Sequence, residues 1–353
     1  MLKKYSLNFK NILLKVLNSS SSLFISIFIS VIFFSIIISL LGYNVFQALN
    51  TLIFTSFSSY FSFCSTIIKT IPILFLSYAY AIPSMVQFFN IGSFGQMIFS
   101  GTVVTVFSLF LGNLESFILI PILIIIGIFS GGIYALIAAI LKIKNNIDPI
   151  ISTIMLNFIS EQFLYYIAGH PYFADPIAGH PTTRSIPKNA LLGFYNGIPY
   201  SLIFALISIF FIYFFVQRSK KGYELLAVGR NINASNIFGI NINNSILWAF
   251  FLGGCFSGLA GTLEIINING KLIAGFASTN GIQLGLFGTL AALIAGSINP
   301  IALFISAFFM SVLMIGANAL QRTMGISVFI VFICQALIVI SIVTIREIFK
   351  KRR

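Results

Sequence analysis

Long apolar runs separated by short polar stretches make up most of this 353-residue chain. A helix needs about 20 mostly apolar residues to cross a bilayer, and about ten runs approach that length. They cover approximately residues 22–41, 67–88, 97–111, 117–141, 150–168, 200–216, 246–266, 282–295, 301–317 and 326–345. The pattern predicts an all-α integral membrane protein with about ten transmembrane helices, forming a single domain over residues 1–353.

Two longer polar segments lie between the predicted helices. Residues 169–199 contain five prolines and frequent glycine and polar residues, which predict a loop outside the bilayer core. Residues 217–244 carry several charges and a short apolar-periodic stretch. Within this stretch Asn233 is a candidate helix cap, Phe238 falls on the apolar face, and Gly239 is a candidate helix end.

Composition also indicates a membrane protein. Only 8% of the residues are Asp, Glu, Lys or Arg, and 58% are apolar, whereas soluble domains have about 25% charged residues. A soluble chain would need more polar surface to cover its core, so a soluble enzyme, a disordered protein and a disulfide scaffold are excluded. The cysteines, Cys64, Cys255 and Cys334, each lie in an apolar run and are interpreted as small hydrophobic side chains.

The remaining charge is strongly basic, with 20 Lys and Arg against 7 Asp and Glu and a net charge of +13. Because cytoplasmic loops of membrane proteins collect basic residues, this excess indicates topology and not nucleic-acid binding. With a cytoplasmic N-terminus and ten crossings, 15 of the 20 basic residues lie inside and 5, among them Lys69 and Lys271, lie at the outer edge. The bias predicts cytoplasmic N- and C-termini, an extracytoplasmic 169–199 loop and a cytoplasmic 217–244 loop.

Four stretches of the chain resemble the motifs of one group of permeases, in the same order. They are residues 89–96 (FNIGSFGQ), 151–159 (ISTIMLNFI), 223–240 (YELLAVG, with GI at its end) and 258–264 (GLAGTLE). The chain is similar to the permease subunits of bacterial ATP-binding cassette (ABC) importers for simple sugars, nucleosides and branched-chain amino acids, and most similar to nucleoside-type permeases. It departs from their pattern at Phe94, where an acidic residue is common, at Leu226, where arginine is common, and at residues 233–235, where Glu-Ala-Ala is common.

The resemblance implies how such a chain is driven and what it binds. The 217–244 loop would form a coupling helix that docks on a separate ATP-hydrolysing subunit, so that partner uses the ATP and this chain binds no cofactor directly. Further expected partners are a second permease subunit, identical or homologous, an extracytoplasmic substrate-binding lipoprotein, and the lipid bilayer of the bacterial cytoplasmic membrane. The expected coupling residues are Glu224, Gly229, Asn233, Ala234, Ser235, Phe238 and Gly239.

Two polar interruptions of the apolar pattern predict a transport pathway. Residues 90–96 contain two glycines and two amides at membrane depth, and a second break follows residue 270. Paired breaks in two inverted five-helix halves are typical of transporter binding sites, although packing glycines or ordinary loops give the same pattern. The candidate pathway residues are Asn90, Gln96, Asn157, Glu161, Asn280 and Gln283.

Acidic residues within the predicted helices are few. Asn157 and Glu161 lie four residues apart, on one helical face, and Glu161 either lines the pathway or makes structural hydrogen bonds. Glu264 lies near the outer end of its predicted helix, where interfacial solvation is sufficient to explain it and pathway lining is the less favoured alternative. In the 169–199 loop, His170 and His180 have no obvious complete ligand set, so no metal site is predicted.

Several functions compete for this pattern. The sequence contains no Gly-x-x-x-x-Gly-Lys-Ser/Thr phosphate loop, so the chain is predicted to be a transport subunit and not an enzyme. The predicted function is the import of nucleosides, or of a related sugar-containing solute, by alternating access. A permease for branched-chain amino acids or simple sugars, and an ATPase-independent secondary transporter, remain alternatives.

Overall fold

The computed structural model describes residues 31–274 and 282–327, and beyond them residues 329–330, 332–333, 336–337, 340–341 and 344. Backbone contacts divide the chain into two compact units. One contains the described residues up to Phe63 together with those from Val312 onward, and the other is Cys64–Ser311. All of the candidate functional residues that the structure describes lie in the larger unit, Cys64–Ser311.

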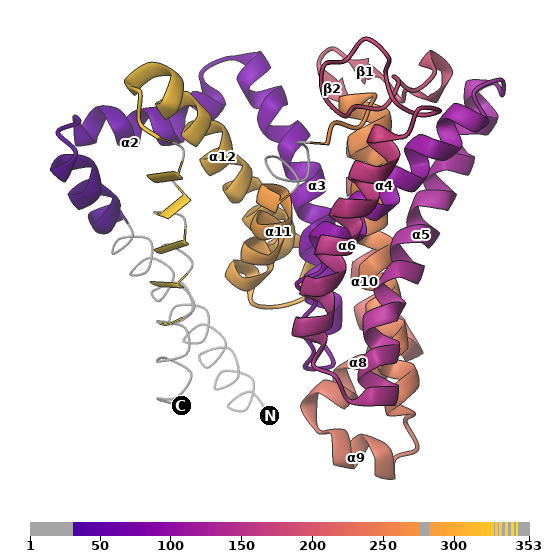
Figure 1. Ribbon diagram of the computed structural model, residues 1–353. Helices are drawn as coiled ribbons and strands as arrows, with labels where there is room; N and C mark the ends of the chain where they lie inside the picture. The colour runs from indigo at the N-terminus through magenta and orange to yellow at the C-terminus, as the bar shows by residue number, and fades with distance from the viewer. Residues whose placement is uncertain are drawn as a thin grey trace. The chain divides into compact units, whose positions relative to one another are not determined.

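Helices make up most of the larger unit (Figure 1). In chain order they are α3 (Tyr60–Ser84, which begins just before the unit boundary), α4 (Ser93–Phe110), α5 (Ser116–Asn145), α6 (Pro149–Gly169), α7 (Ser201–Arg218), α8 (Lys220–Arg230), α9 (Ile232–Ile237), α10 (Ile242–Leu263) and α11 (Ile282–Ala295). Helix α10 continues directly as a π-helix, η3 (Glu264–Asn269). Between α6 and α7 lie the 3-10 helix η2 (Lys188–Ala190) and an antiparallel hairpin of β1 (Phe194–Tyr195) and β2 (Ile198–Pro199).

The smaller unit contains a helix over Val31–Leu40, α2 (Val45–Phe54), the 3-10 helix η1 (Thr55–Phe57) and the C-terminal part of α12 (Pro300–Met324). Gly316 of α12 packs directly on α2, because a Cβ at this position would lie 2.0 Å from the Leu52 carbonyl oxygen. Helix α2 was not among the helices that the apolar runs predict.

Seven helices among the described residues are long and apolar enough to cross a membrane: α3, α4, α5, α6, α7, α10 with η3, and α12. Each matches one predicted segment. The predicted segment at residues 282–295 is α11, which at 14 residues is shorter than a typical span. The segments at 22–41 and 326–345 lie partly or largely outside the described residues. The structure thus agrees with an all-α membrane protein, and the ten crossings stay a prediction.

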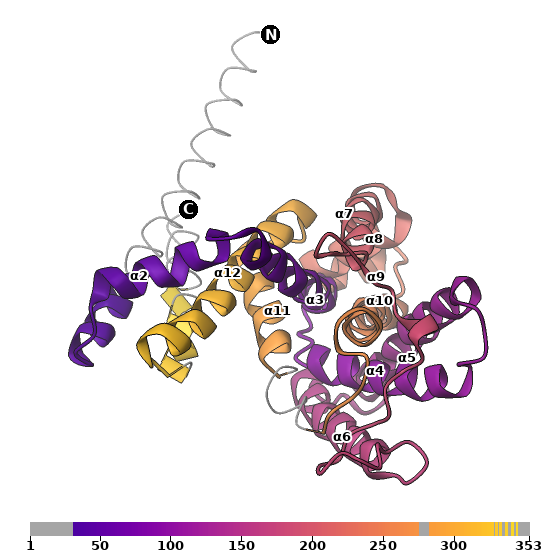
Figure 2. The same cartoon turned by 90° about the horizontal axis from the view of Figure 1, so that it is seen from above.

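Helix α10 lies at the centre of the larger unit, between α3, α4, α5 and α8 (Figure 2). Its contact with α5 depends on glycine, because a Cβ at Gly131 would lie 2.5 Å from the Gly254 carbonyl oxygen and 2.6 Å from the Gly258 Cα. The Ser100 hydroxyl of α4 lies 2.9 Å from the carbonyl oxygens of both Gly127 and Gly258. Small residues allow such close approach of helices in lipid, and they join α4, α5 and α10 into one rigid core.

The larger unit has two ends formed by different elements. Helices α8 and α9 lie at one end, and the hairpin and its flanking loop lie at the other (Figure 1). Helix α5 connects them, from its start beside η2 to its C-terminus near α8. These are called the α9 end and the hairpin end below.

Candidate functional site

The chain between α3 and α4, residues 85–92, is not helical and is called the α3–α4 interruption below; of the predicted break at residues 90–96, residues 93–96 instead form the first turn of α4. Helix α3 ends at Ser84 and α4 begins at Ser93. Asn90 is fully buried in the interruption. Its Nδ2 donates to the Ala79 carbonyl oxygen and to Gln96 Oε1, both at 3.1 Å, and its Oδ1 accepts from Gly92 N at 3.0 Å and Gln96 Nε2 at 3.1 Å. The Asn90 and Gln96 amides therefore form hydrogen bonds with each other, and Asn90 also bonds to backbone groups that have no helical partner there.

Asn157 joins α6 to the same interruption. Its Oδ1 accepts from Gly95 N at 2.9 Å, and its Nδ2 donates to the Ile91 carbonyl oxygen at 3.2 Å. Gly95 has to be glycine here, since a Cβ would lie 2.5 Å from Asn157 Oδ1. Asn90 and Gln96 bond to each other and Asn157 bonds to the backbone beside them, and these three residues are called the amide cluster below. Their contact with a solute stays a prediction.

The other predicted pathway residues are only partly connected with this cluster. Glu161 is half-buried on α6, one turn beyond Asn157, and makes no hydrogen bond or ion pair with the described residues. Gln283 is half-buried in the first turn of α11. The same turn contains Gly285, which packs so closely on α4 that a Cβ there would lie 2.6 Å from the Phe94 Cβ. Asn280 lies outside the described residues.

A second interruption follows η3, and the 169–199 loop covers it. The π-helix ends at Gly270, which has a φ of +63°. Backbone N–H groups of the loop donate to this segment: Ile186 to the Gly270 carbonyl oxygen and Leu192 to that of Ile266, each at 2.8 Å. Asn267 accepts from Ser201 N at 3.0 Å through Oδ1. The loop is therefore an ordered cover at the hairpin end.

Glu264, at the start of η3, is buried, with only 2% of its surface exposed. Its Oε1 lies 3.6 Å from Lys69 Nζ of α3 and 3.5 Å from Asn269 Nδ2, while Oε2 has no hydrogen-bond partner. The interpretation of Glu264 as a solvated interfacial residue is therefore wrong, because η3 and α3 exclude water from it. The sequence did not reveal the ion pair, because Lys69 and Glu264 are far apart in the chain. The presence of two opposite charges within apolar runs was the one indication of such a pair.

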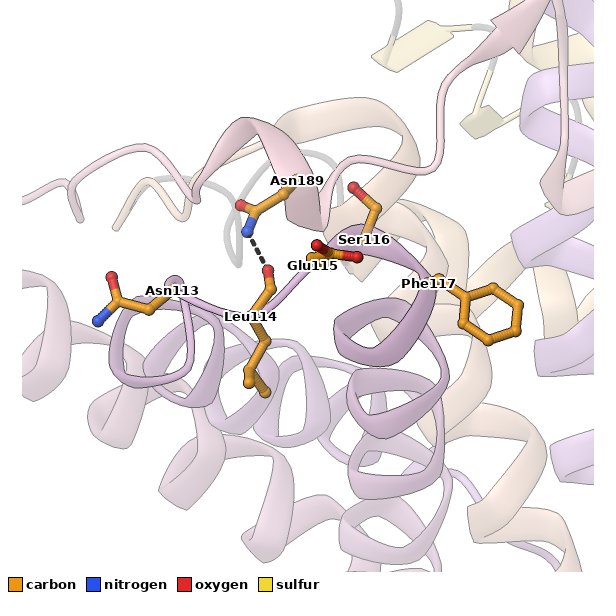
Figure 3. Close-up of a pocket in the computed structure, with 6 residues that line it drawn as sticks. All are labelled: Asn113, Leu114, Glu115, Ser116, Phe117 and Asn189. Carbon is orange, nitrogen blue, oxygen red and sulfur yellow. Dashed lines mark hydrogen bonds between the residues drawn. The ribbon is translucent and has the colours of Figure 1, made fainter.

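The recess at the turn between α4 and α5 shows how the loop is anchored (Figure 3). Asn189 of η2 donates through Nδ2 to the carbonyl oxygens of Gly112, at 2.8 Å, and Leu114. Phe117, at the edge of the recess, is 89% exposed. Among the described residues, no group of three or more His, Cys, Asp or Glu is placed to hold a metal ion. His170 instead accepts a hydrogen bond from Tyr172 N through Nδ1 at 3.2 Å.

At the α9 end, helix α8 packs directly on the α3–α4 interruption. Gly229 lies so close that a Cβ would be 1.7 Å from the Met85 carbonyl oxygen. Gln87, at a φ of +65°, donates through Nε2 to the Gly229 carbonyl oxygen at 3.0 Å. Glu224 pairs with Lys221 within α8 at 2.7 Å. The sequence identified Gly229 but not its contacts, because nothing in the pattern indicates which backbone it meets.

Helix α9 presents an apolar surface to solvent. Ile237 and Phe238 are 85% and 83% exposed. Gly239, with a φ of +75°, ends the helix as predicted. The predicted cap is wrong: Asn231 caps α9, accepting from Ala234 N through Oδ1 at 3.0 Å, and Asn233 lies exposed inside the helix. Helix α9 begins two residues earlier than predicted because α8 ends at Arg230, directly before Asn231.

The remaining predicted coupling residues differ in exposure. Ala234 is half-buried, and Ser235 is buried with its hydroxyl donating to the Asn231 carbonyl oxygen at 2.8 Å. A cleft of about 280 Å³ opens between the end of α3, α8 and the end of α11. Leu226 of α8 lines it together with Tyr80 and Phe89, whose rings stack 5.9 Å apart. Helix α8 and the α3–α4 interruption thus share one cavity.

Comparison with known proteins relates this arrangement to transport subunits. The family model for the permease component of branched-chain amino acid transport systems matches residues 62–341. A glucose ABC transporter permease of Haloferax volcanii is 24% identical over 311 residues, covering 84% of this chain and 79% of the relative. A guanosine ABC transporter permease of Bacillus subtilis is 28% identical over 308 residues (85% and 86%), and a nucleoside ABC transporter permease of Lactococcus lactis is 27% identical over 299 residues (82% and 81%). No solved structure matches the chain.

Proposed function

Because the chain belongs to the permease components of branched-chain amino acid transport systems, we propose that it imports nucleosides, or a related sugar-containing solute, as the membrane-spanning subunit of an ABC importer. The observation that carries the substrate class is the set of relatives that align over most of both chains, which carry a nucleoside, guanosine or glucose. A sugar ring is the chemistry common to these solutes. Import of branched-chain amino acids, as in the family's description, is the second candidate.

The proposed docking site for the ATP-hydrolysing subunit is the exposed surface of α9. Burying an apolar side chain of the size of Ile237 or Phe238 contributes about 1.5–3 kcal/mol, so this small surface is able to stabilise a complex. Gly229 and Gln87 then connect the surface to the α3–α4 interruption through direct contact and a 3.0 Å hydrogen bond. A displacement of α8 by the ATPase would therefore move the turn at residues 85–88.

The proposed orientation places the α9 end in the cytoplasm and the hairpin end outside. Basic residues support it, because Lys142, Lys144, Arg218 and Lys220 lie near the α9 end of their helices, where cytoplasmic segments collect positive charge. In this proposal both chain termini are cytoplasmic and the chain crosses the bacterial cytoplasmic membrane ten times, in two inverted halves of five helices.

The proposed mechanism is alternating access around the amide cluster. In the described conformation Asn90, Gln96 and Asn157 bond only to protein groups. Amides also suit the hydroxyls and base edges of a nucleoside, so movement of α8 would exchange protein partners for solute. A second permease subunit completes the transporter, and a substrate-binding lipoprotein delivers the solute at the hairpin end.

Reconstitution tests this function directly. The chain is co-expressed with candidate ATPase and binding-protein subunits from its own genome, placed in proteoliposomes, and assayed for uptake of a purine nucleoside, a hexose and leucine. We expect ATP-dependent uptake of the nucleoside or the hexose. Uptake without any ATPase would identify a secondary transporter, and uptake of leucine alone would refute the sugar-containing substrate class.

A further inference from the structure

The Lys69–Glu264 pair is an ionic contact inside the helical bundle that leaves half of a carboxylate unused. Lys69 Nζ and Asn269 Nδ2 both approach Oε1, at 3.6 and 3.5 Å, and neither is a short contact. Oε2 is buried and without a hydrogen-bond partner. A buried acceptor in this state has lost its hydration without replacement, which raises the free energy of the conformation.

Glu264 lines a narrow crevice of the helical bundle. Glu264 is the first residue of η3, and π-helical turns inside α-helices are frequent at functional sites. The crevice that Glu264 lines is bounded by Ile71, Pro72 and Phe75 of α3 and by Ser201 at the start of α7. In this conformation the crevice is too narrow for a water molecule. No solvent therefore replaces the missing hydrogen bond.

Helix α3 contains the means to open the crevice. Pro72 lies within α3, one turn after Lys69. Proline cannot donate to the carbonyl four residues earlier, so a helix bends more easily at this point. Lys69 itself is not locked in place, since 22% of its side chain is exposed. A bend at Pro72 would widen the crevice at Oε2 and leave the opposite wall, η3, held by the loop through Asn267.

The charges define which ligand suits the opened site. Lys69 balances the charge of Glu264, so the pair as a whole favours neither a cation nor an anion. The free oxygen accepts hydrogen bonds and donates none, which suits hydroxyl or N–H groups. A neutral solute with several hydroxyls fits these conditions.

We propose that Glu264 is a solute-binding residue that accepts hydrogen bonds from the hydroxyls of a neutral, sugar-containing solute, with Lys69 as the residue that positions and balances it. This inference rests on the proposed function and deepens it, because it names a residue that would contact the hydroxyls of the solute. It adds a second solute contact near the hairpin end, separate from the amide cluster.

The test uses the complete reconstituted transporter and three variants, Glu264→Gln, the charge exchange Lys69→Glu/Glu264→Lys, and the control Glu115→Gln. Glu115 is exposed at the start of α5, away from the pair. Uptake of a ribonucleoside and its 2′,3′-dideoxy analogue is measured with thermal unfolding of each variant. Because hydrogen bonds to charged groups contribute about 1.5–3 kcal/mol, we expect Glu264→Gln to raise KM for the ribonucleoside roughly 10- to 100-fold. The preference over the analogue should fall by a similar factor.

The outcomes separate the inference from the function on which it rests. The charge exchange should restore thermal stability but not KM, because it retains the ion pair and moves the free oxygen to α3. Full recovery of KM in the exchange, or a change below twofold in Glu264→Gln, would show a purely structural pair and overturn the inference alone. Wild-type transporter that takes up leucine and no sugar-containing solute would instead overturn the proposed function.

Discussion

Gly229 offers the sharpest test of the connection between α8 and the α3–α4 interruption. A Cβ at this position would lie 1.7 Å from the Met85 carbonyl oxygen, whereas carbon–oxygen contacts need about 3.3 Å. In Gly229→Ala, α8 therefore has to retreat by about 1.6 Å. That displacement also breaks the 3.0 Å hydrogen bond from Gln87 Nε2 to the Gly229 carbonyl oxygen.

The energetic cost follows from three terms. Overpacking costs about 1–3 kcal/mol and the lost hydrogen bond about 0.5–1.5 kcal/mol, while alanine in place of glycine returns about 1 kcal/mol of helix propensity. Gly229→Ala should therefore destabilise the chain by about 2 kcal/mol. The substitution moves the contact between α8 and Met85 but leaves the α9 surface unchanged. ATPase binding should therefore persist, whereas uptake should fall because α8 no longer contacts the α3–α4 interruption in the same way.

The assay compares thermal unfolding, ATPase co-purification and uptake for Gly229→Ala and Gly169→Ala. Gly169 is the matched control, because it also lies at the end of a helix but a Cβ there meets nothing within 4 Å. We expect the control to behave as wild type. Wild-type stability and uptake in Gly229→Ala would refute both the contact and the coupling role assigned to it.

Three further substitutions test other parts of the site. Asn231→Ala should destabilise α9 by about 1 kcal/mol, measured by hydrogen exchange of its backbone amides. Asn233→Ala should leave the stability of α9 nearly unchanged. A larger loss in Asn233→Ala than in Asn231→Ala would show that Asn233 is the cap. Asn90→Ala leaves several buried groups of the amide cluster without partners and should lower stability by about 2–4 kcal/mol, so an unchanged unfolding temperature would contradict the cluster. Phe238→Asp should abolish co-purification of the ATPase without loss of stability. The control Phe117→Asp, at the hairpin end, should leave co-purification unchanged. If the ATPase co-purifies equally with both variants, α9 is excluded as the docking surface.

Local features of the fold and site were predictable where a residue acts through its own backbone or its neighbours. Apolar runs located the seven helices that, among the described residues, are long and apolar enough to cross a membrane, because a lipid-facing helix needs a minimum apolar length. Gly239 ends α9 because it alone in that stretch adopts a positive φ without cost. The glycines and amides of residues 90–96 indicated a break that the structure places at residues 85–92, and the sequence did not show that Asn90 and Gln96 bond to each other.

Contacts between distant segments were decided only by the tertiary structure. The sequence favoured a solvated interface for Glu264, yet η3 and α3 bury it beside Lys69. The cap of α9 shifted from Asn233 to Asn231, since both residues are good caps and the end of α8 selects between them. Hydrophobic length and backbone preference are properties of a segment, whereas the burial of a charge depends on which helices meet around it.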